Sequence, residues 1–252
     1  MRKMKKYILL LCCIVQFGFA NEQTFKKANE YYKNENYQAA LQLFESIANK
    51  GVTSSDLYFN IGNCYYKLGK TAPAIYNYEK GLLLNPNDEA LKTNLSFAQK
   101  LAIDDIKIVP EVGFKKILKN ATNSLHYDTW AWLAIAFAFF GLANFLGYYF
   151  SGTVLLKRLF FSTFLLALGI VIVSVSAGFY NKKLDLQYNP ALVFAATSPL
   201  KAAPKNSSET VLTLHEGTKV NILQELGNWN QVQLSDKTIA WINKNDIKNI
   251  KD

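Results

Sequence analysis

The chain has 252 residues, half of them hydrophobic, and a formal net charge of +9. Four of its 28 basic residues stand in the first six positions, and the remaining 24, set against 19 acidic residues, form no run of five or more. This distribution argues against binding to nucleic acid. The high apolar fraction suggests instead that part of the chain lies in lipid.

Residues 1–20 have the three parts of a secretory signal: a basic start, an apolar stretch, and the small residues Gly18 and Ala20 at the end. We expect cleavage after Ala20; an uncleaved anchor and a lipoprotein are the alternatives. All three place the following residues outside the cytoplasm. Because two of the three cysteines lie in this segment, the mature chain would keep only Cys64 and could form no internal disulfide.

The next segment repeats itself, because residues 21–54 match residues 55–88 at an offset of 34. The matched positions are Ala28 with Gly62, Tyr31 with Tyr65, Ala40 with Ala74, and Phe44 with Tyr78. The pattern resembles the tetratricopeptide repeat (TPR) family, in which small residues let two helices approach closely. Residues 88–101, with Asn87 as their cap, repeat the spacing of a first helix. Residues 21–101 are therefore predicted to form two repeats and a capping helix.

Some residues recur at this offset although the core of a TPR does not require them. Their spacing places them on one helix face, which in TPR proteins lines a concave groove, where asparagine amides bind the backbone of an extended peptide. The predicted groove residues are Phe25, Asn29, Tyr32, Lys33, Phe59, Asn60, Asn63, Tyr66 and Lys67. The alternative is that these residues are ordinary packing and solvated surface inherited by duplication.

Residues 129–150 and 159–180 contain no charged residue, and each run is long enough to span a bilayer as a helix. The two runs are predicted to form a transmembrane hairpin, with residues 151–158 as a cytoplasmic loop carrying Lys157 and Arg158. Since the spans contain no Asp, Glu, Lys, Arg or His, the hairpin is interpreted as an anchor rather than a conduit.

The linker expected over residues 102–128 contains a mixed apolar and basic stretch. Phe114, Ile117 and Leu118 stand among three lysines, Lys115, Lys116 and Lys119. This pattern suggests a helix that lies in the membrane interface.

After a second linker at residues 181–189, the pattern over residues 190–252 changes to short strand-like runs. The five predicted strands are residues 191–195, 210–214, 219–226, 230–234 and 239–243. The Gly217 turn, Trp229 and the Ala240-Trp241-Ile242 run resemble the bacterial SH3 family, which implies a small all-β barrel. Tyr188, Trp229 and Trp241 could form an aromatic binding surface; the alternative is that both tryptophans belong to the core or rim of the barrel.

The sequence offers little for catalysis. Its two histidines, His126 and His215, stand in different segments, and no cluster of cysteines or carboxylates has metal-ligand spacing. There is no phosphate-binding glycine loop and no nucleophile motif. We therefore predict a multidomain protein without cofactor or metal that is not an enzyme.

The order of a signal, two TPRs, a two-helix hairpin and an SH3-like end resembles the BatE family of the bacterial aerotolerance operon. The resemblance implies a non-catalytic scaffold in the bacterial inner membrane, with both folded parts in the periplasm. The implied partners are von Willebrand A-domain membrane proteins and a MoxR-type ATPase. The alternative is a peptidoglycan-binding anchor that recruits a cell-wall enzyme. A stress sensor is disfavoured because the loop at residues 151–158 is too short to signal alone.

Overall fold

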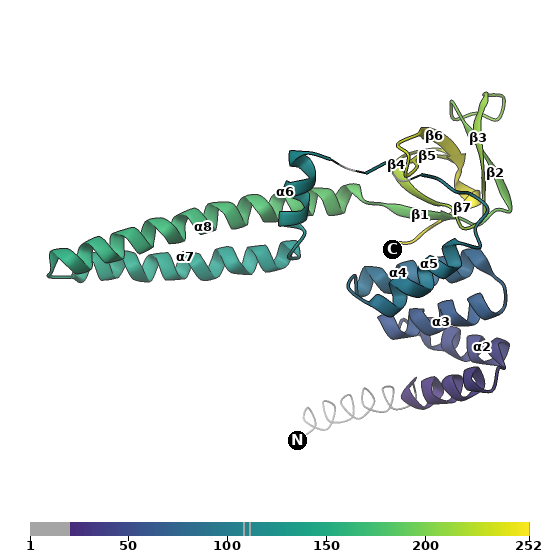
Figure 1. The fold of residues 1–252 in the computed structure, drawn as a ribbon, viewed down its shortest axis with the longest axis horizontal. Helices are drawn as coiled ribbons and strands as arrows, with labels where there is room; N and C mark the ends of the chain where they lie inside the picture. Colours follow the sequence, from purple (N-terminus) through teal and green to yellow (C-terminus); the bar gives the residue numbers. More distant parts are fainter. Residues whose placement is uncertain (1–20, 108, 111, 252) are drawn as a thin grey trace, which may run out of the picture. The chain divides into compact units, whose positions relative to one another are not determined.

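The computed structural model describes residues 21–107, 109–110 and 112–251, so the predicted signal at residues 1–20 lies outside the described residues. The chain divides into two compact units. One comprises the segments Met1–Ile108 and Asn189–Asp252, and the other comprises Val109–Tyr188. Figure 1 shows the helices and strands of both units along the chain.

The first unit begins with the predicted helical repeats. Its helices are residues 21–33, α2 (Tyr37–Ala48), α3 (Ser55–Lys67), α4 (Thr71–Leu84) and α5 (Glu89–Gln99). The second pair starts 34 residues after the first, in agreement with the sequence offset. Asp88, rather than the expected Asn87, caps α5, because its carboxylate accepts hydrogen bonds from the backbone N–H groups of Ala90 and Leu91.

Close helix packing in the second repeat depends on Gly62. A Cβ at this position would lie 2.5 Å from Cε1 of Tyr78, which is too close for any side chain to fit without a shift. In the first repeat the corresponding pair is Ala28 and Phe44, and both are fully buried. The expected role of the small residues is therefore seen directly: they let an aromatic ring from the second helix of each repeat lie against the first.

In the described part of the chain, seven strands form one antiparallel sheet in the order β3-β2-β6-β5-β4-β1-β7. The strands are β1 (Pro190–Val193), β2 (Thr197–Lys201), β3 (Thr210–His215), β4 (Lys219–Leu226), β5 (Trp229–Gln233), β6 (Ile239–Asn243) and β7 (Ile247–Asn249). The prediction of five strands was wrong in number, because β2 and β7 were missed. β2 contains Pro199, which weakens the sequence signal of a strand.

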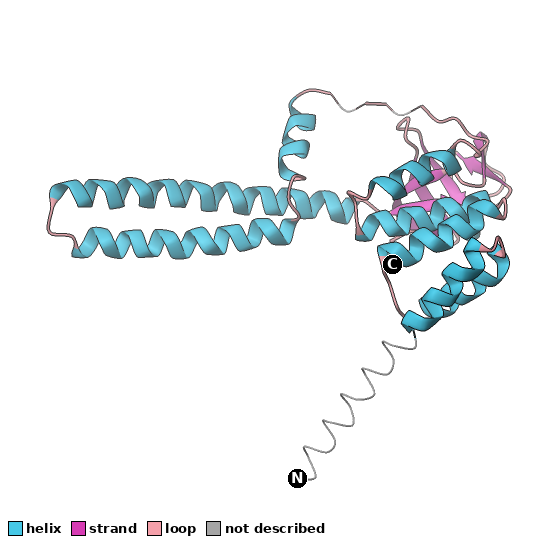
Figure 2. Cartoon of the chain, turned by 60° about the horizontal axis from the view of Figure 1, so that its bottom comes forward, coloured by secondary structure: helices cyan, strands magenta, loops and turns pink. Residues whose placement is uncertain are grey.

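The sheet packs against the repeats, so the two form one unit. Leu192 of β1 and Ile250 share a core with residues of α4 and α5, including Ile75 and Leu91. Figure 2 shows the repeat helices beside the strands. The linear order of segments did not predict this shared core.

Two polar contacts accompany this core. The hydroxyl of Tyr76 donates to the backbone oxygen of Asn249 at 3.0 Å. The ammonium of Lys219 lies 2.7 Å from the carboxylate of Glu79, which is largely buried. The α4 helix therefore presents both apolar and charged side chains to the sheet.

Asp104 fastens the segment after α5 to the sheet. Its carboxylate accepts hydrogen bonds from the backbone N–H of His215 (2.7 Å) and the hydroxyl of Thr218 (2.6 Å), and Nδ1 of His215 lies 2.7 Å away. Burial alone would raise the pKa of Asp104, but these hydrogen bonds and the His215 charge outweigh it and lower the pKa. The start of the segment expected to be a linker is thus bound to the sheet.

The second unit contains α6 (Phe114–Thr122), α7 (Tyr127–Phe150) and α8 (Val154–Gln187). The last two are long and apolar enough to cross a membrane, and they pack as a hairpin (Figure 1). Inside the hairpin, the hydroxyl of Thr163 donates to the amide oxygen of Asn144 at 2.6 Å. This bond fixes the register of the two helices.

The helices α7 and α8 extend beyond residues 129–150 and 159–180, the ranges predicted from the absence of charged residues. Because α8 begins at Val154, the break between the helices covers only residues 151–153 rather than 151–158. Because α8 continues to Gln187, most of the linker expected over residues 181–189 is helical. Helical propensity does not end at the first charged residue, so Lys157, Arg158, Lys182 and Lys183 are all inside the helix.

Candidate functional site

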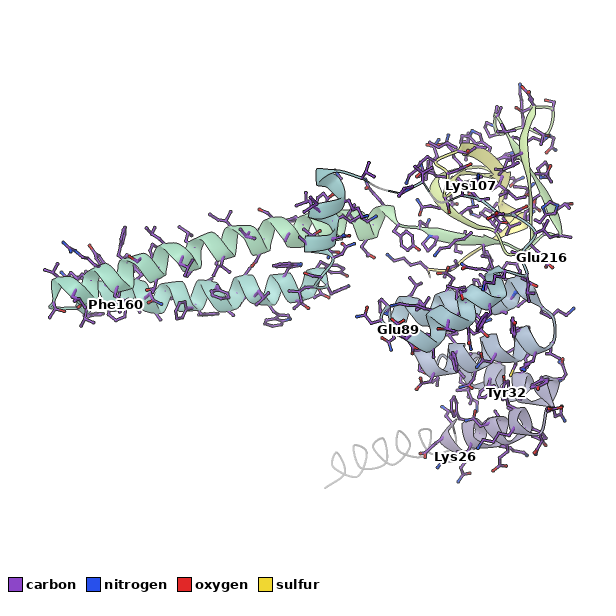
Figure 3. The ribbon with its side chains drawn as sticks, viewed as in Figure 1. Lys26, Tyr32, Glu89, Lys107, Phe160 and Glu216 are labelled. Carbon is purple, nitrogen blue, oxygen red and sulfur yellow. The ribbon has the colours of Figure 1, made fainter. Side chains whose placement is uncertain are left out.

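A pocket of about 170 Å³ opens among the helices of the repeats. It is lined by Tyr32, Asn63, Tyr66, Lys67, Tyr78, Asn94 and Phe97. These residues come from the first helix of each repeat, from α4 and from α5, and Figure 3 labels Tyr32 among the side chains of the repeats. The predicted groove face and the capping helix therefore enclose one concave site.

Asn63 joins two other residues of the pocket lining through hydrogen bonds. Its amide oxygen accepts a hydrogen bond from the hydroxyl of Tyr78 and another from the amide nitrogen of Asn94, both at 2.8 Å. The two bonds use the acceptor capacity of this oxygen and fix the orientation of the side chain. The NH₂ group of Asn63 is thereby left as the part that can donate to a ligand.

The hydroxyl of Tyr78 reaches Asn63 because Gly62 lets the ring pass close to α3. Burial, followed by the nearby Tyr32 and Tyr66, raises the pKa of Tyr78. The phenol therefore remains protonated and serves as a permanent hydrogen-bond donor. It holds Asn63 and does not act as a base.

The walls of the pocket combine aromatic rings with one cation. Tyr32 packs edge-to-face against Tyr37 with ring centroids 5.2 Å apart, and burial raises its pKa. Phe97 is about half exposed, and Lys67 is exposed at the rim. Aromatic walls beside an oriented amide suit a peptide that offers apolar side chains and backbone carbonyl groups.

The structure brings four of the nine predicted groove residues into this pocket: Tyr32, Asn63, Tyr66 and Lys67. Phe25 packs instead on buried Phe44 at 5.3 Å, and Phe59 packs on Tyr78 at 6.3 Å. Within the described residues, Asn29, Lys33 and Asn60 lie outside the pocket lining.

The amide nitrogen of Asn60 donates to the backbone oxygen of Asp56 in its own helix, at 2.8 Å. For Phe25 and Phe59, helical spacing did not distinguish side chains that face the groove from those that turn toward the core.

Three pocket residues were missed by the sequence argument: Tyr78, Asn94 and Phe97. In the sequence, Tyr78 is only the counterpart of Phe44 at the offset of 34. The phenol hydroxyl, which phenylalanine lacks, is the signal that could have pointed to it. Asn94 stands in the capping helix, 31 residues after Asn63. Aligning the capping helix with the first helices of the two repeats would have placed Asn94 on the face that meets Asn63.

Comparison with known proteins supports the repeat architecture. The model of the tetratricopeptide repeat family matches residues 55–88. Residues 55–88 are a tetratricopeptide repeat. The chain is also similar to tetratricopeptide repeat protein 16 of Homo sapiens and of Macaca fascicularis, with 30% identity over 69 residues in each case. The matched region covers 27% of this chain and only 8% of the length of those relatives.

The three residues predicted to form an aromatic surface come from two different parts of the structure. Trp229 and Trp241 lie on the same face of β5 and β6, because Trp241 pairs with Gln231 while Asn230 and Ile242 point into the core. Trp229 is half-buried, and Trp241 is only 9% exposed. Tyr188 caps α8 and belongs to the other compact unit.

One histidine and the buried cysteine illustrate the state of the residues that could support chemistry. Among the described residues, no group of three or more histidine, cysteine or acidic side chains is placed to hold a metal ion. His215 contacts Asp104, and Cys64 is buried. Burial, with a smaller effect of Glu45, raises the pKa of Cys64 to about 12, so its thiol is not ionised at neutral pH.

Proposed function

We propose that this chain is a membrane-anchored, non-catalytic scaffold that binds an extended segment of a partner protein in the pocket around Asn63. The observation that carries the proposal is the double acceptor role of the Asn63 oxygen, which turns its NH₂ group into a fixed donor. An amide held in this way loses little conformational entropy on binding a peptide carbonyl. TPR modules generally serve protein–protein interaction, which agrees with this role.

The membrane anchor in this proposal is the α7–α8 hairpin. Large apolar side chains such as Phe139, Tyr149 and Leu166 are about two-thirds exposed or more along it, as suits lipid contact. Following the order of segments, the repeats and the sheet lie in the periplasm and the hairpin crosses the inner membrane. Reporters fused after residue 110, between the repeats and the hairpin, and after residue 252 test this topology, and fusions that report opposite sides of the membrane would contradict it.

The partners in this proposal are von Willebrand A-domain membrane proteins that act with a MoxR-type ATPase in a BatE-type aerotolerance complex. The similarity of the segment order to that family supports this assignment. The sheet, as an SH3-like module, would hold a second partner. Sedimentation with purified peptidoglycan sacculi separates this proposal from the wall-anchor alternative, because a scaffold of membrane proteins should stay in the supernatant.

Affinity purification in mild detergent tests the groove. Tyr66→Ala combined with Phe97→Ala removes two aromatic walls of the pocket, and we expect it to abolish co-purification of the von Willebrand A-domain protein. Leu83→Ala combined with Leu84→Ala is the matched control, since both leucines are exposed on α4 outside the pocket. Equal recovery of the partner with both double variants would reject the groove as its binding site.

A further inference from the structure

The helix α6 is tied across the open end of the α7–α8 hairpin. The backbone oxygen of Thr122, its last residue, accepts hydrogen bonds from the indole N–H of Trp130 at 2.8 Å and from the amide nitrogen of Asn181 at 2.9 Å. Asn181 also donates to the backbone oxygen of Leu125 at 2.8 Å. These three hydrogen bonds therefore join the end of α6 to both helices of the hairpin, and α6 runs across the hairpin (Figure 1).

The apolar stripe of this helix is not covered by the hairpin. Phe114, Ile117 and Leu118 stand at positions i, i+3 and i+4, which is the spacing of one helix face, and Ile117 and Leu118 are 66% and 36% exposed. Val112 and Leu125, on either side of the helix, are 77% and 36% exposed. An exposed apolar face that is continuous with two lipid-compatible helices is expected to enter the same apolar phase.

Lysines gather at the same end of the unit. Residues 112–123 contain three lysines and no acidic residue. Lys182 and Lys183 follow Asn181 directly, and both side chains are exposed. The nearest acidic residues in sequence are three: Glu111, Asp128, which lies 3.3 Å from His126, and Asp185. Five lysines against these three carboxylates leave a net positive charge in these two stretches of sequence.

We propose that α6 and the adjacent turn of α8 form a basic collar that docks on the headgroups of anionic phospholipids. Lys116, Lys119, Lys182 and Lys183 contact the lipid phosphates, while Ile117 and Leu118 enter the acyl boundary. The proposal rests on the membrane crossing proposed above. A polybasic segment at an anionic bilayer gains roughly fivefold in binding per lysine, and an amphipathic helix adds its apolar area. The collar would set the depth of the hairpin and select the lipid around it.

A fluorescent label on the full-length protein tests the collar. Ile117→Cys, in a chain with Cys12 and Cys13 replaced by alanine, carries a polarity-sensitive dye, and buried Cys64 can remain because its thiol is shielded. The protein is reconstituted in vesicles of phosphatidylcholine alone or with about one-third phosphatidylglycerol. We expect blue-shifted emission with phosphatidylglycerol, a weaker shift without it, and reversal at high salt. The same dye at Lys50→Cys, an exposed position of the other unit, should stay water-exposed.

Charge reversal provides the decisive comparison. Lys116→Glu with Lys119→Glu should lower the docked population at least tenfold in phosphatidylglycerol vesicles. Lys50→Glu with Lys205→Glu makes the same change in net charge in the other unit and should have no effect. Emission that stays unshifted with phosphatidylglycerol, or that shifts equally in both lipids, overturns the collar. Protease protection of the hairpin is measured in parallel, so a failure of membrane insertion is recognised as a failure of the anchor instead.

Discussion

The two repeats share a pattern at an offset of 34 residues, yet only the second is specialised. Glu45 of the first repeat accepts a hydrogen bond from Tyr65 of the second, whereas the equivalent Glu79 pairs with Lys219 of the sheet. At another equivalent position, Gln42 is exposed while Tyr76 is buried against the sheet. The sheet thus occupies part of the surface that a following repeat would cover, because a repeat cannot bury its own outer face.

A second difference concerns the pocket. Phe44 and Tyr78 occupy equivalent positions, but only Tyr78 has the hydroxyl that holds Asn63. Gly62, at the position equivalent to Ala28, lacks the Cβ that would clash with the Tyr78 ring. The two repeats therefore share one helical architecture, and positions at which the second differs from the first shape the pocket around Asn63.

The largest effect should come from the attachment of the sheet to the second repeat. Asp104→Ala leaves the hydrogen-bond donors of His215 and Thr218 without their acceptor and should lower the free energy of unfolding of the unit by about 3 kcal/mol. Hydrogen exchange over residues 210–226 and urea unfolding measure this loss. Asp105→Ala, at the exposed neighbouring position, is the control. Equal protection in both variants would contradict the role of Asp104.

The same contact should be sensitive to acid. Because the pKa of Asp104 in the folded chain is lowered below the unfolded value of about 3.9, its carboxylate stabilises the fold above that pH. This contribution is lost as the pH falls through the lowered pKa. The difference in unfolding free energy between the wild type and Asp104→Ala should therefore shrink below about pH 4. A difference that is constant from pH 7 to about pH 3 would rule out a carboxylate effect.

Gly62→Ala tests the close approach in the second repeat. The added methyl group would meet the Tyr78 ring at 2.5 Å, and we expect a loss of about 2 kcal/mol, after the gain in helix propensity is included. Tyr78→Ala removes the ring, so Gly62→Ala added to that variant should cost nothing further. If the two losses simply add in thermal unfolding, the clash is not the cause.

Tyr78→Phe makes the second repeat resemble the first and should have the smallest effect on stability. It removes the hydroxyl bond to Asn63 and should cost about 1 kcal/mol of unfolding free energy. It should also weaken partner recovery, because the Asn63 amide is then held by Asn94 alone. Tyr31→Phe in the first repeat is the control, and a loss of partner with that variant would show a general effect of tyrosine hydroxyls.

Much of the helical part could be predicted from the sequence, because helix starts and small residues repeat with a fixed period. Tyr32, Asn63, Tyr66 and Lys67 were placed in the groove on this basis, and the structure brings them together. The two apolar helices were also evident from the absence of charge. These features are local, so periodicity and composition reveal them.

The remaining features depend on contacts between distant residues. Asp104 and His215 are 111 positions apart, and neither belongs to a recognisable motif. The strand β2 was missed because Pro199 interrupts its pattern, although pairing with β3 holds it in the sheet. Likewise, the burial of Phe25 and Phe59 depends on which aromatic ring they meet. Such facts follow from tertiary packing and not from local propensity.

The most direct test of the account is site-specific photocrosslinking in intact cells. A photoreactive phenylalanine at Phe97, at the edge of the pocket, should capture a von Willebrand A-domain membrane protein. The same group at Leu84, which is similarly exposed on α4 outside the pocket, should not. Capture at position 97 alone is the predicted result. Equal capture at both positions, or capture at position 84 alone, would contradict a scaffold that holds its partner in the pocket of the second repeat.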